Sequence, residues 1–318
     1  KQKIPLKDHR KDTYLNEALT HRVKYCRLLR KPMGNRWHWY VQIVLEGIPP
    51  RKHAFREDGR VGLDQGISTE AIVAEDGCLL ACLGPGDRYD APAKECQQKM
   101  DRSLRQNNPE EYHADGTVKK KKHRWKYSRR YRKEQLKLKT IRRKASDTAK
   151  QKEHMLCNTI LERYGSDIFT EKMDYKALAK RAQSEEEELS KGKKKRFGAS
   201  IGKNAPGRFI GTLKQKLGYI GKTITVVDLY GFKASQYDHV KDAYEKHDLD
   251  ERWKDIGGML VQRDLYSGFL LRNAEEPTEE GPPKKPDRQK CMEGFTSFLR
   301  DQYECITDML GEGISNKA

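Results

Sequence analysis

The sequence has no long apolar run and no CxxC pair of cysteines, and each absence excludes a class of protein. No stretch of the 318 residues approaches the ~18 apolar residues that a membrane span needs, which excludes an integral membrane protein. The seven cysteines are odd in number and form no CxxC pair, which argues against a disulfide framework and for a reducing compartment. Hydrophobic residues make up only 35% of the chain, but this suffices for a core at such a length. The first residue is Lys rather than Met, so we expect a fragment of a longer protein.

Acidic residues are also in deficit, and the deficit is local. The chain has 65 Lys and Arg against 47 Asp and Glu, a formal net charge of +18. Between Lys119 and Lys152 there are 17 basic and two acidic residues, a local net charge of +15, which leaves about +3 (18 − 15) elsewhere. A single dense positive stripe suits a polyanion, so nucleic acid is the expected partner. The alternative is a solvated charged helix without a ligand, for which a balanced charge pattern would be typical.

Two alternating segments near the start predict a β-hairpin. Residues 22–30 and 36–46 alternate apolar with basic or polar residues, and Lys31 to Asn35 between them supplies turn residues. Trp37 and Trp39, beside Arg36, could stack on bases as in nucleic-acid platforms. The same aromatic side chains could equally pack the sheet.

The next part of the chain predicts three short strands, two helices and then alternating elements. A first strand that carries an Asp, followed by two antiparallel neighbours, is typical of the opening of a ribonuclease-H-like fold; the second of the two helices carries the basic stripe. The length predicts roughly two domains. The expected strands are 60–66, 69–75, 78–83, 166–171 and 223–228; the expected helices are 93–106, 119–164, 174–182, 207–219, 259–272 and 287–310; 183–206 is expected to be a mobile loop and 233–258 a polar stretch.

Three acidic residues stand out by their context. Asp64 lies in the first strand, Glu171 ends a later strand, and Asp264 lies in a mostly apolar helix. A carboxylate at a buried position is costly unless it is paired or bound to metal. Taken singly, Asp64 could accept hydrogen bonds in a turn, Glu171 could begin a helix, and Asp264 could pair with Arg263 or Lys254. Their order along the strands and helices favours a site for two divalent ions, Mg²⁺ or Mn²⁺.

A family resemblance rests on an ordered set of segments. VGLDQGIST, a basic helical segment, IFTEKMDYKALAKR, GRFIGTLKQKLGYIGKTITVVDLYGFKASQYDH and QRDLYSGFLLRN follow one another. Together they resemble the RuvC nuclease core of TnpB-type (OrfB) transposon-associated proteins, relatives of type V CRISPR effectors, over about residues 20–274. The family's three catalytic and metal-binding acids fall on Asp64, Glu171 and Asp264. Its TSQ segment appears as Ala234-Ser235-Gln236.

The resemblance implies an RNA-guided DNA endonuclease with guide RNA and target DNA as partners, two Mg²⁺ or Mn²⁺ ions, and an open question of a second copy of the protein on one RNA. It implies an α/β, ribonuclease-H-like mixed sheet with inserted long basic helices, in a cytoplasmic, nucleoid-associated protein. The implied division is 1–50 as the end of a β-barrel wedge, 51–232 as the RuvC core with a helical insertion at 93–164 and a lid loop at 183–206, 233–258 as a zinc-free remnant of the target-binding insert, 259–274 as the last RuvC segment, and 275–318 as a linker and C-terminal helix, which we expect to dock on the core. The expected nucleic-acid contacts are Arg36, Trp37, Trp39, Lys122, Arg124, Trp125, Lys126, Arg129, Arg130, Arg132, Lys133, Arg142, Arg143 and Gln236.

The sequence departs from the family pattern in three places. The zinc ribbon normally found after TSQ uses two CxxC pairs, but residues 237–262 contain no cysteine, so we expect no structural zinc. Asn-Ala-Ala after the last Asp is replaced by Tyr266-Ser267-Gly268, which keeps a small residue for close helix packing. The N-terminal part of the wedge and the recognition helices are missing or truncated.

Two alternative functions stay open at this point. The chain could be a catalytically silent, RNA-guided DNA-binding protein that acts as a repressor, although all three acids are present. It could also be a transposase or resolvase that works without a guide.

Overall fold

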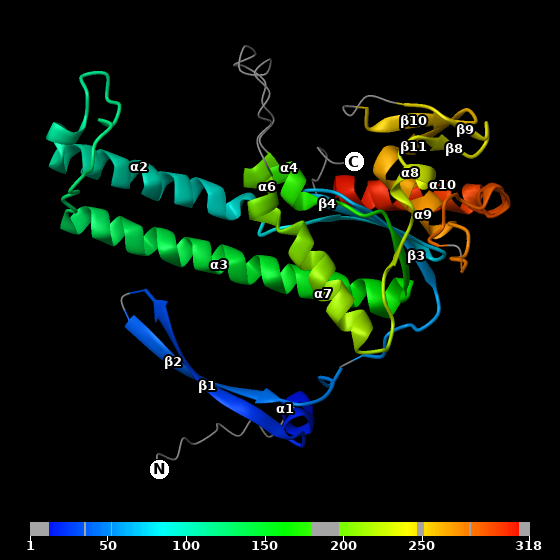
Figure 1. The fold of residues 1–318 in the computed structure, drawn as a ribbon, viewed down its shortest axis with the longest axis horizontal. Coiled ribbons are helices and arrows are strands. Elements are labelled where there is room, and N and C mark those ends of the chain that lie inside the picture. The colour runs from blue at the N-terminus through cyan, green and yellow to red at the C-terminus, as the bar shows by residue number, and fades with distance from the viewer. Residues whose placement is uncertain are drawn as a thin grey trace. The chain divides into compact units, whose positions relative to one another are not determined.

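The computed structural model describes residues 13–34, 36–51, 53–179, 197–246, 251–279 and 281–311 (Figure 1). The chain forms two compact units. One unit contains residues 1–54 and 86–148, and the other contains residues 55–85 and 149–318. The second unit is thus assembled from two separate stretches of the sequence, and it contains all three acidic residues of interest.

The second unit is built on a five-stranded mixed sheet with the order β5-β4-β3-β6-β7. Strands β3 (Arg60–Gln65), β4 (Thr69–Ala74) and β5 (Gly77–Cys82) form an antiparallel meander, as the turn residues predicted. Strands β6 (Asp167–Thr170) and β7 (Thr225–Val226) continue the sheet in parallel with β3. The expected α/β class with a mixed sheet is confirmed. The strand expected over 223–228 pairs over only two residues.

Side chains alternate between the two faces of this sheet and bury a separate core on each. One core gathers Val61, Leu63 and Ile72 with the end of α3 (Arg129–Thr159), its π-helical turn Ile160–Tyr164 and α7 (Pro206–Gly218). The other core gathers Ala71, Val73 and Phe169 with α9 (Arg263–Arg272) and α10 (Arg288–Gly311). Asp64 follows the second pattern, so its side chain belongs to the face that α9 covers.

Helix α9 lies directly on β3 because glycine stands on both sides of the contact. A Cβ atom on Gly62 would be 1.9 Å from the carbonyl oxygen of Gly268 and 2.4 Å from the backbone nitrogen of Arg272. A Cβ atom on Gly268 would be 2.9 Å from Cγ2 of Val73. The small residue that the sequence keeps after the last Asp therefore allows the close packing expected of it.

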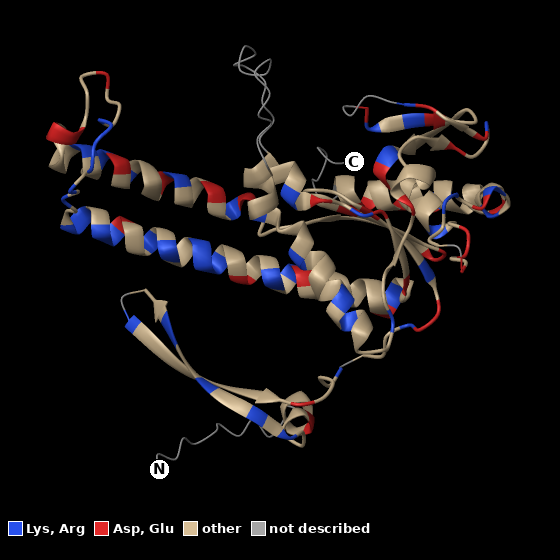
Figure 2. Cartoon of the chain, viewed as in Figure 1, with Lys and Arg blue, Asp and Glu red and all other residues tan. Residues whose placement is uncertain are grey.

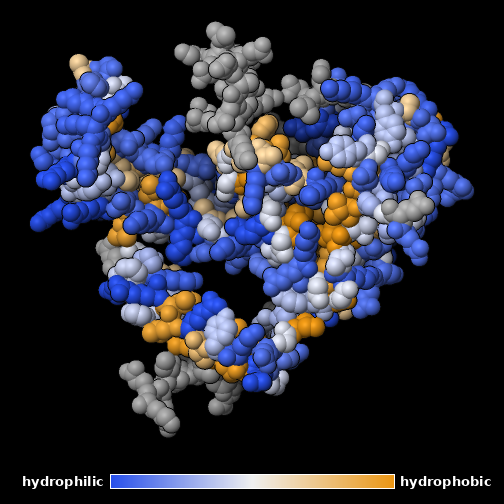
Figure 3. Space-filling view, viewed as in Figure 1, coloured by the Kyte–Doolittle hydropathy of each residue, from blue (hydrophilic) through white to orange (hydrophobic). Residues whose placement is uncertain are grey.

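The first unit contains a long β-hairpin of β1 (Val23–Met33) and β2 (Arg36–Leu45), preceded by the short helix α1 (Thr13–Ala18). The predicted hairpin is confirmed. Most of its side chains are exposed, and Figure 3 shows hydrophobic residues on its surface. The two tryptophans at issue, Trp37 and Trp39, are 54% and 60% exposed, so they do not pack a core in this part of the structure.

The first unit also contains α2 (Asp90–Asn107) and most of α3, which lie side by side (Figure 1). The hydroxyl groups of Tyr89 and Thr148 are 2.8 Å apart near one end, and those of Ser103 and Ser128 are 2.7 Å apart near the other. The expectation of a helix from 119 was wrong, because α3 begins at Arg129. Ser128 caps it by accepting a hydrogen bond from the backbone nitrogen of Tyr131 at 3.0 Å.

A short 3-10 turn, Asp87–Tyr89, precedes α2, and a second one, Pro109–Glu111, follows it. The residues between the second turn and the cap of α3 form an irregular segment. The Asn108 side chain accepts from the backbone nitrogen of Lys126 at 2.7 Å and donates to its carbonyl oxygen at 3.0 Å. These two bonds occupy backbone groups of Lys126, so the helix cannot extend back through it. Four residues expected on the helix therefore lie in this segment: Lys122, Arg124, Trp125 and Lys126.

The second half of the sequence shows further differences from expectation. The polar stretch 233–258 contains the hairpin of β8 (Tyr237–Asp238) and β9 (Ala243–Tyr244), and it also contains β10 (Trp253–Ile256). Strand β10 pairs with β11 (Met259–Gln262), so the helix expected from 259 begins only at Arg263. Within the expected loop 183–206, the helix α6 (Phe197–Asn204) forms, and residues 183–196 lie outside the described residues. The remaining short helices are α4 (Tyr175–Ala179) and α8 (Leu229–Phe232).

Helix α10 docks on the core, as expected for the C-terminal helix. Cys291, Phe298, Cys305 and Met309 are buried in the core that α9 also lines. Met292 is 52% exposed, because helical spacing places it beside the buried stripe. Across the described helices, none combines the length and apolar character that a bilayer crossing requires.

Candidate active site

The three acidic residues come from three elements that meet at one edge of the sheet. Asp64 is the fifth residue of β3, and Glu171 directly follows β6, the parallel neighbour of β3. Asp264 is the second residue of α9, which packs on β3. Parallel strands end at the same edge of a sheet, and the glycine contact brings α9 to that edge. The fold thus gathers the residues that the sequence analysis selected.

The carboxyl group of Asp64 lies near the negative charges of two other acids. Burial raises the pKa of Asp64 well above its ordinary value, and the negative charges of Asp264 and Glu171 raise it further. The guanidinium of Arg263 acts in the opposite direction but is the smallest of these effects. Uncompensated negative charge of this kind favours either a proton or a cation at the site.

Glu171 is held by the segment Ala234-Ser235-Gln236, called the ASQ segment below. Its Oε1 atom accepts a hydrogen bond from the backbone nitrogen of Ala234 at 2.8 Å. Burial raises the pKa of Glu171, while this bond acts to lower it. Lys254, which is buried on β10, donates from Nζ to the carbonyl oxygen of Ser235 and so ties the ASQ segment to the insert. Gln236 is half-buried beside these residues.

Asp264 contacts two arginines. Its Oδ1 is 3.1 Å from Nε of Arg263, and its Oδ2 is 3.3 Å from a terminal guanidinium nitrogen of Arg252. Of the two partners considered from the sequence, Arg263 is confirmed and Lys254 is replaced by Arg252. The signal for Arg252 was absent from the sequence, because twelve positions and a β-hairpin separate it from Asp264.

A fourth acid, Glu70, was missed because it stands in an ordinary strand pattern. It is fully buried on β4, and neither carboxyl oxygen has a hydrogen-bond partner among the residues that the structure describes. It lies opposite Gln65 on β3, which places it on the face of the sheet opposite to Asp64. Burial, and then the charge of Asp64, raise the pKa of Glu70 well above its ordinary value.

The donor set at the edge of the sheet suits a divalent cation. Carboxylate oxygens are the ligands that Mg²⁺ and Mn²⁺ prefer, and a cation would neutralise the charges of Asp264 and Glu171, which add to the effect of burial in raising the pKa of Asp64. Within the described ranges, no three His, Cys, Asp or Glu side chains are close enough together to ligate one ion. Asp264 contacts arginines instead, so its carboxylate would have to exchange these partners to join the other two acids.

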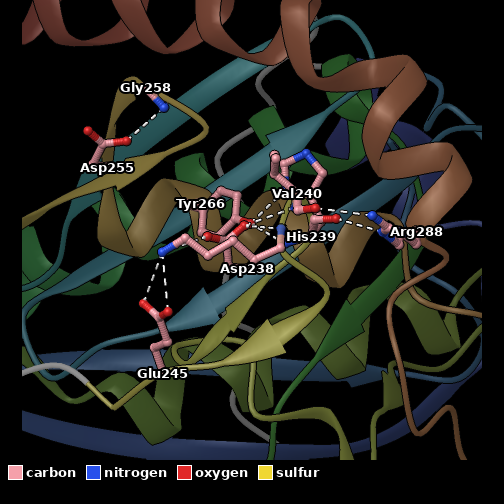
Figure 4. A network of polar contacts seen from close by, with 9 residues as sticks. Asp238, His239, Val240, Glu245, Asp255, Gly258, Tyr266 and Arg288 are labelled. Carbon is pink, nitrogen blue, oxygen red and sulfur yellow. Dashed lines mark hydrogen bonds and ion pairs between the residues drawn. The ribbon is translucent and has the colours of Figure 1, made fainter.

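The insert between the ASQ segment and α9 is anchored by a buried polar network (Figure 4). The His239 side chain is fully buried, and its Nδ1 is 2.8 Å from the hydroxyl oxygen of Tyr266 on α9. Arg288 on α10 donates to the carbonyl oxygens of His239 at 2.9 Å and Val240 at 3.0 Å. Burial lowers the pKa of His239, which favours the neutral form of the ring. His247, Asp248 and Asp250, which with His239 lack the spacing of a zinc finger, lie outside the described residues.

The expected nucleic-acid contacts on α3 form a cationic surface (Figure 2). Arg129, Arg130, Arg132, Lys133 and Arg142 are exposed along the helix. Arg143 is half-buried and pairs with Asp147 at 2.9 Å. The exposed cations match the stripe that the sequence indicated, and the helical repeat spreads them around several sides of α3.

The aromatic candidates in the first unit have different surroundings. Trp125 is half-buried and stacks on His123 with ring centroids 4.8 Å apart, so its own segment packs it. The Trp37 ring is exposed, and the Arg30 guanidinium lies 3.7 Å from its centroid. Arg36 and Trp39 are exposed on the same hairpin. Arg30 was missed because it lies on the other strand, where it pairs with Trp39 and stands two positions before the partner of Trp37.

Comparisons with known proteins give a distant likeness to solved structures alone. No protein-family model and no curated protein matches the chain. Among solved structures, it is similar to a chain in the "Cryo-EM structure of the Cas12f1-sgRNA-target DNA complex", with a TM-score of 0.44 and 10% sequence identity. The similarity covers 80% of this chain and 46% of the solved one, so this chain spans less than half the length of that structure. A TM-score below 0.5 establishes neither a shared fold nor a shared function.

Proposed function

We propose that this chain is an RNA-guided endonuclease that hydrolyses target DNA at a carboxylate site of the ribonuclease-H-like, RuvC type. The observation that carries the proposal is the meeting of Asp64, Glu171 and Asp264 at one edge of the sheet, where burial and then the charges of the other two acids raise the pKa of Asp64. The antiparallel β3–β4–β5 meander with parallel β6 beside β3 supports the same fold assignment.

In this proposal the three carboxylates would hold two divalent ions, Mg²⁺ or Mn²⁺, which supply charge stabilisation for the attacking water and the leaving oxygen. Arg252 and Arg263 would then release the Asp264 carboxylate and bind a phosphate of the DNA instead, because guanidinium groups bind carboxylates and phosphates in the same geometry. Ala234 holds the carboxylate of Glu171 in place through its backbone nitrogen. The network of His239, Tyr266 and Arg288 anchors the insert from which Arg252 comes.

The cationic surface of α3 supports guide RNA and target DNA as partners. Exposed arginine and lysine side chains bind phosphates without reading bases, which suits a protein that leaves sequence recognition to base pairing. On the hairpin, Trp37 and Arg30 present a ring and a guanidinium at the surface, and such a pair can stack on an unpaired base.

The test is whether a discrete RNA co-purifies with the protein and directs cleavage of matching DNA in Mg²⁺. We expect Asp64→Ala to abolish cleavage while RNA binding persists, because Asp64 lies in the second unit and the cationic surface in the first. Asp308→Ala, an exposed acid on α10, is the matched control and should cut normally. Absence of RNA, or cleavage that persists in Asp64→Ala, would contradict the proposal.

A second candidate is a silent, RNA-guided DNA-binding protein. The contacts of Asp264 with Arg252 and Arg263 favour it, because they neutralise one of the three acids without a metal ion. The same assay separates the two candidates: guided DNA binding without cleavage in either Mg²⁺ or Mn²⁺ would select the silent protein.

A further inference from the structure

The backbone pairing between β3 and β6 ends one residue before the two acids. The last pair in the parallel ladder is Leu63 with Thr170, and Asp64 and Glu171 come next on their strands. The ladder therefore leaves the spacing between the two carboxylate-bearing residues undetermined. Another contact has to set that spacing if both carboxylates are to serve one metal site.

The Gln65 side chain provides a cross-link at this point. Its Nε2 atom donates to the Glu171 carbonyl oxygen at 3.0 Å and to the Thr170 hydroxyl oxygen at 2.8 Å. Thr170 passes the connection back to β3, since its hydroxyl group donates to the Leu63 carbonyl oxygen at 2.6 Å. Gln65 and Thr170 are 8% and 2% exposed, so water does not compete for these bonds.

A tyrosine contacts the amide from the other side. The Tyr175 hydroxyl group, at the start of α4, donates to Oε1 of Gln65 at 3.0 Å. The Glu171 carbonyl oxygen can only accept, so Nε2 must face it, and a flipped amide would lose that bond. A carboxylate at this position could not donate to Thr170 and Glu171, so glutamine is specifically required.

We propose that Gln65 is a positioning residue for the metal-binding acids: its amide sets the spacing of Asp64 and Glu171, and the Tyr175 hydroxyl group holds the amide from the other side. The inference rests on the proposed function, because it concerns how tightly that site binds its ions. Gln65 itself points to the opposite face from Asp64, so it acts only through the strand ends.

The experiment measures Mn²⁺ binding to the purified full chain by electron paramagnetic resonance, which requires no cleavage. We expect Gln65→Met, similar in size but without hydrogen bonds, to raise the Mn²⁺ dissociation constant by about 10- to 100-fold, as loss of supporting contacts at metal sites does. Tyr175→Phe should raise it roughly fivefold, the effect of one hydrogen bond. The control is Asn273→Leu, which removes a buried amide bond at the far end of α9, about two and a half helical turns from Asp264.

The outcomes separate this inference from the proposed function. Weaker Mn²⁺ binding in Gln65→Met, with wild-type affinity in Asn273→Leu, would support the positioning role. Equal loss of Mn²⁺ affinity in Gln65→Met and Asn273→Leu, or unchanged affinity in a folded Gln65→Met, would overturn the positioning role. Neither result would contradict the proposed function as long as the wild-type protein binds Mn²⁺. If Gln65→Met does not fold, wild-type affinity in Tyr175→Phe would overturn the positioning role instead. Wild-type protein that binds no Mn²⁺ would overturn both.

Discussion

Replacing Gly62 with alanine tests the contact on which the position of Asp264 depends. Helix α9 rests on β3 at this residue, and α9 carries Asp264 to the edge of the sheet where Asp64 lies. An added methyl group would stand 1.9 Å from the Gly268 carbonyl oxygen, whereas Cβ atoms do not approach other atoms closer than 3.0 Å. The helix would have to move by at least 1.1 Å (3.0 − 1.9), and no side chain can yield in its place because both atoms met are backbone.

The expected destabilisation follows from this overlap. Overpacking a core by one methylene costs about 1–3 kcal/mol, and a backbone clash belongs at the upper end, so we expect about 3 kcal/mol. For a domain of 150–250 residues, each kcal/mol lowers the Tm by roughly 2–4 °C, which gives roughly 6–12 °C. Without the clash, glycine to alanine would stabilise a strand, so the sign of the effect is itself diagnostic.

The assay is thermal unfolding of the full chain followed by circular dichroism. The control is Gly211→Ala on α7, where nothing lies within 4 Å of the added Cβ, and it should stabilise by about 0.5–1 kcal/mol through helix propensity. A Gly62→Ala variant with an unchanged or higher Tm would refute the close contact of α9 with β3 and the placement of Asp264 that follows from it.

Three further predictions concern the other buried and charged groups. The pKa of Glu70 is raised in the folded state, so its contribution to stability is full below the unfolded-state pKa and is lost as pH rises through the folded-state pKa. The unfolding free energy of wild type should therefore fall with rising pH relative to Glu70→Gln. Parallel pH profiles from chemical denaturation would contradict this. His239→Ala should cost about 2–4 kcal/mol, whereas a zinc-selective chelator should leave the Tm unchanged, and a zinc content near one per chain by elemental analysis would contradict the expectation of no zinc. Replacing Arg129 and Arg130 with glutamine should reduce the salt dependence of RNA affinity by about 0.7–0.9 per charge in a log–log plot, while Lys214→Gln on α7 should not; equal slopes would place the RNA contact elsewhere.

The strands were the most predictable part of the fold. Alternation and turn residues located the hairpin and the β3–β4–β5 meander to within one or two residues, except at the ends of β1, because such signals are local. The start of α3 was placed ten residues early, because Asn108 holds the backbone of Lys126 from eighteen positions away. The start of α9 was placed four residues early, because β11 pairs with a strand that polar residues concealed.

The candidate site divides in the same way. Asp64, Glu171 and Asp264 were selected from the sequence because a buried carboxylate is costly and because the three follow one another in the strand and helix order of the family that the sequence resembles. Arg252, Glu70 and Gln65 were missed. Each resembles an ordinary surface or strand residue until its partner from another element is known.

The sequence by itself determined the concentration of positive charge, the strand pattern and the identity of the three acids, because each is a property of residues close together along the chain. Tertiary structure alone decided what those acids contact. Parallel pairing placed Glu171 beside Asp64, and a contact between two glycines brought in Asp264. In the same fold, Asp264 contacts two arginines and Glu171 accepts a hydrogen bond from a backbone nitrogen. Glu70 has no hydrogen-bond partner within the described ranges. Distances between residues remote in sequence depend on how the elements pack, and that information is not contained in any one segment.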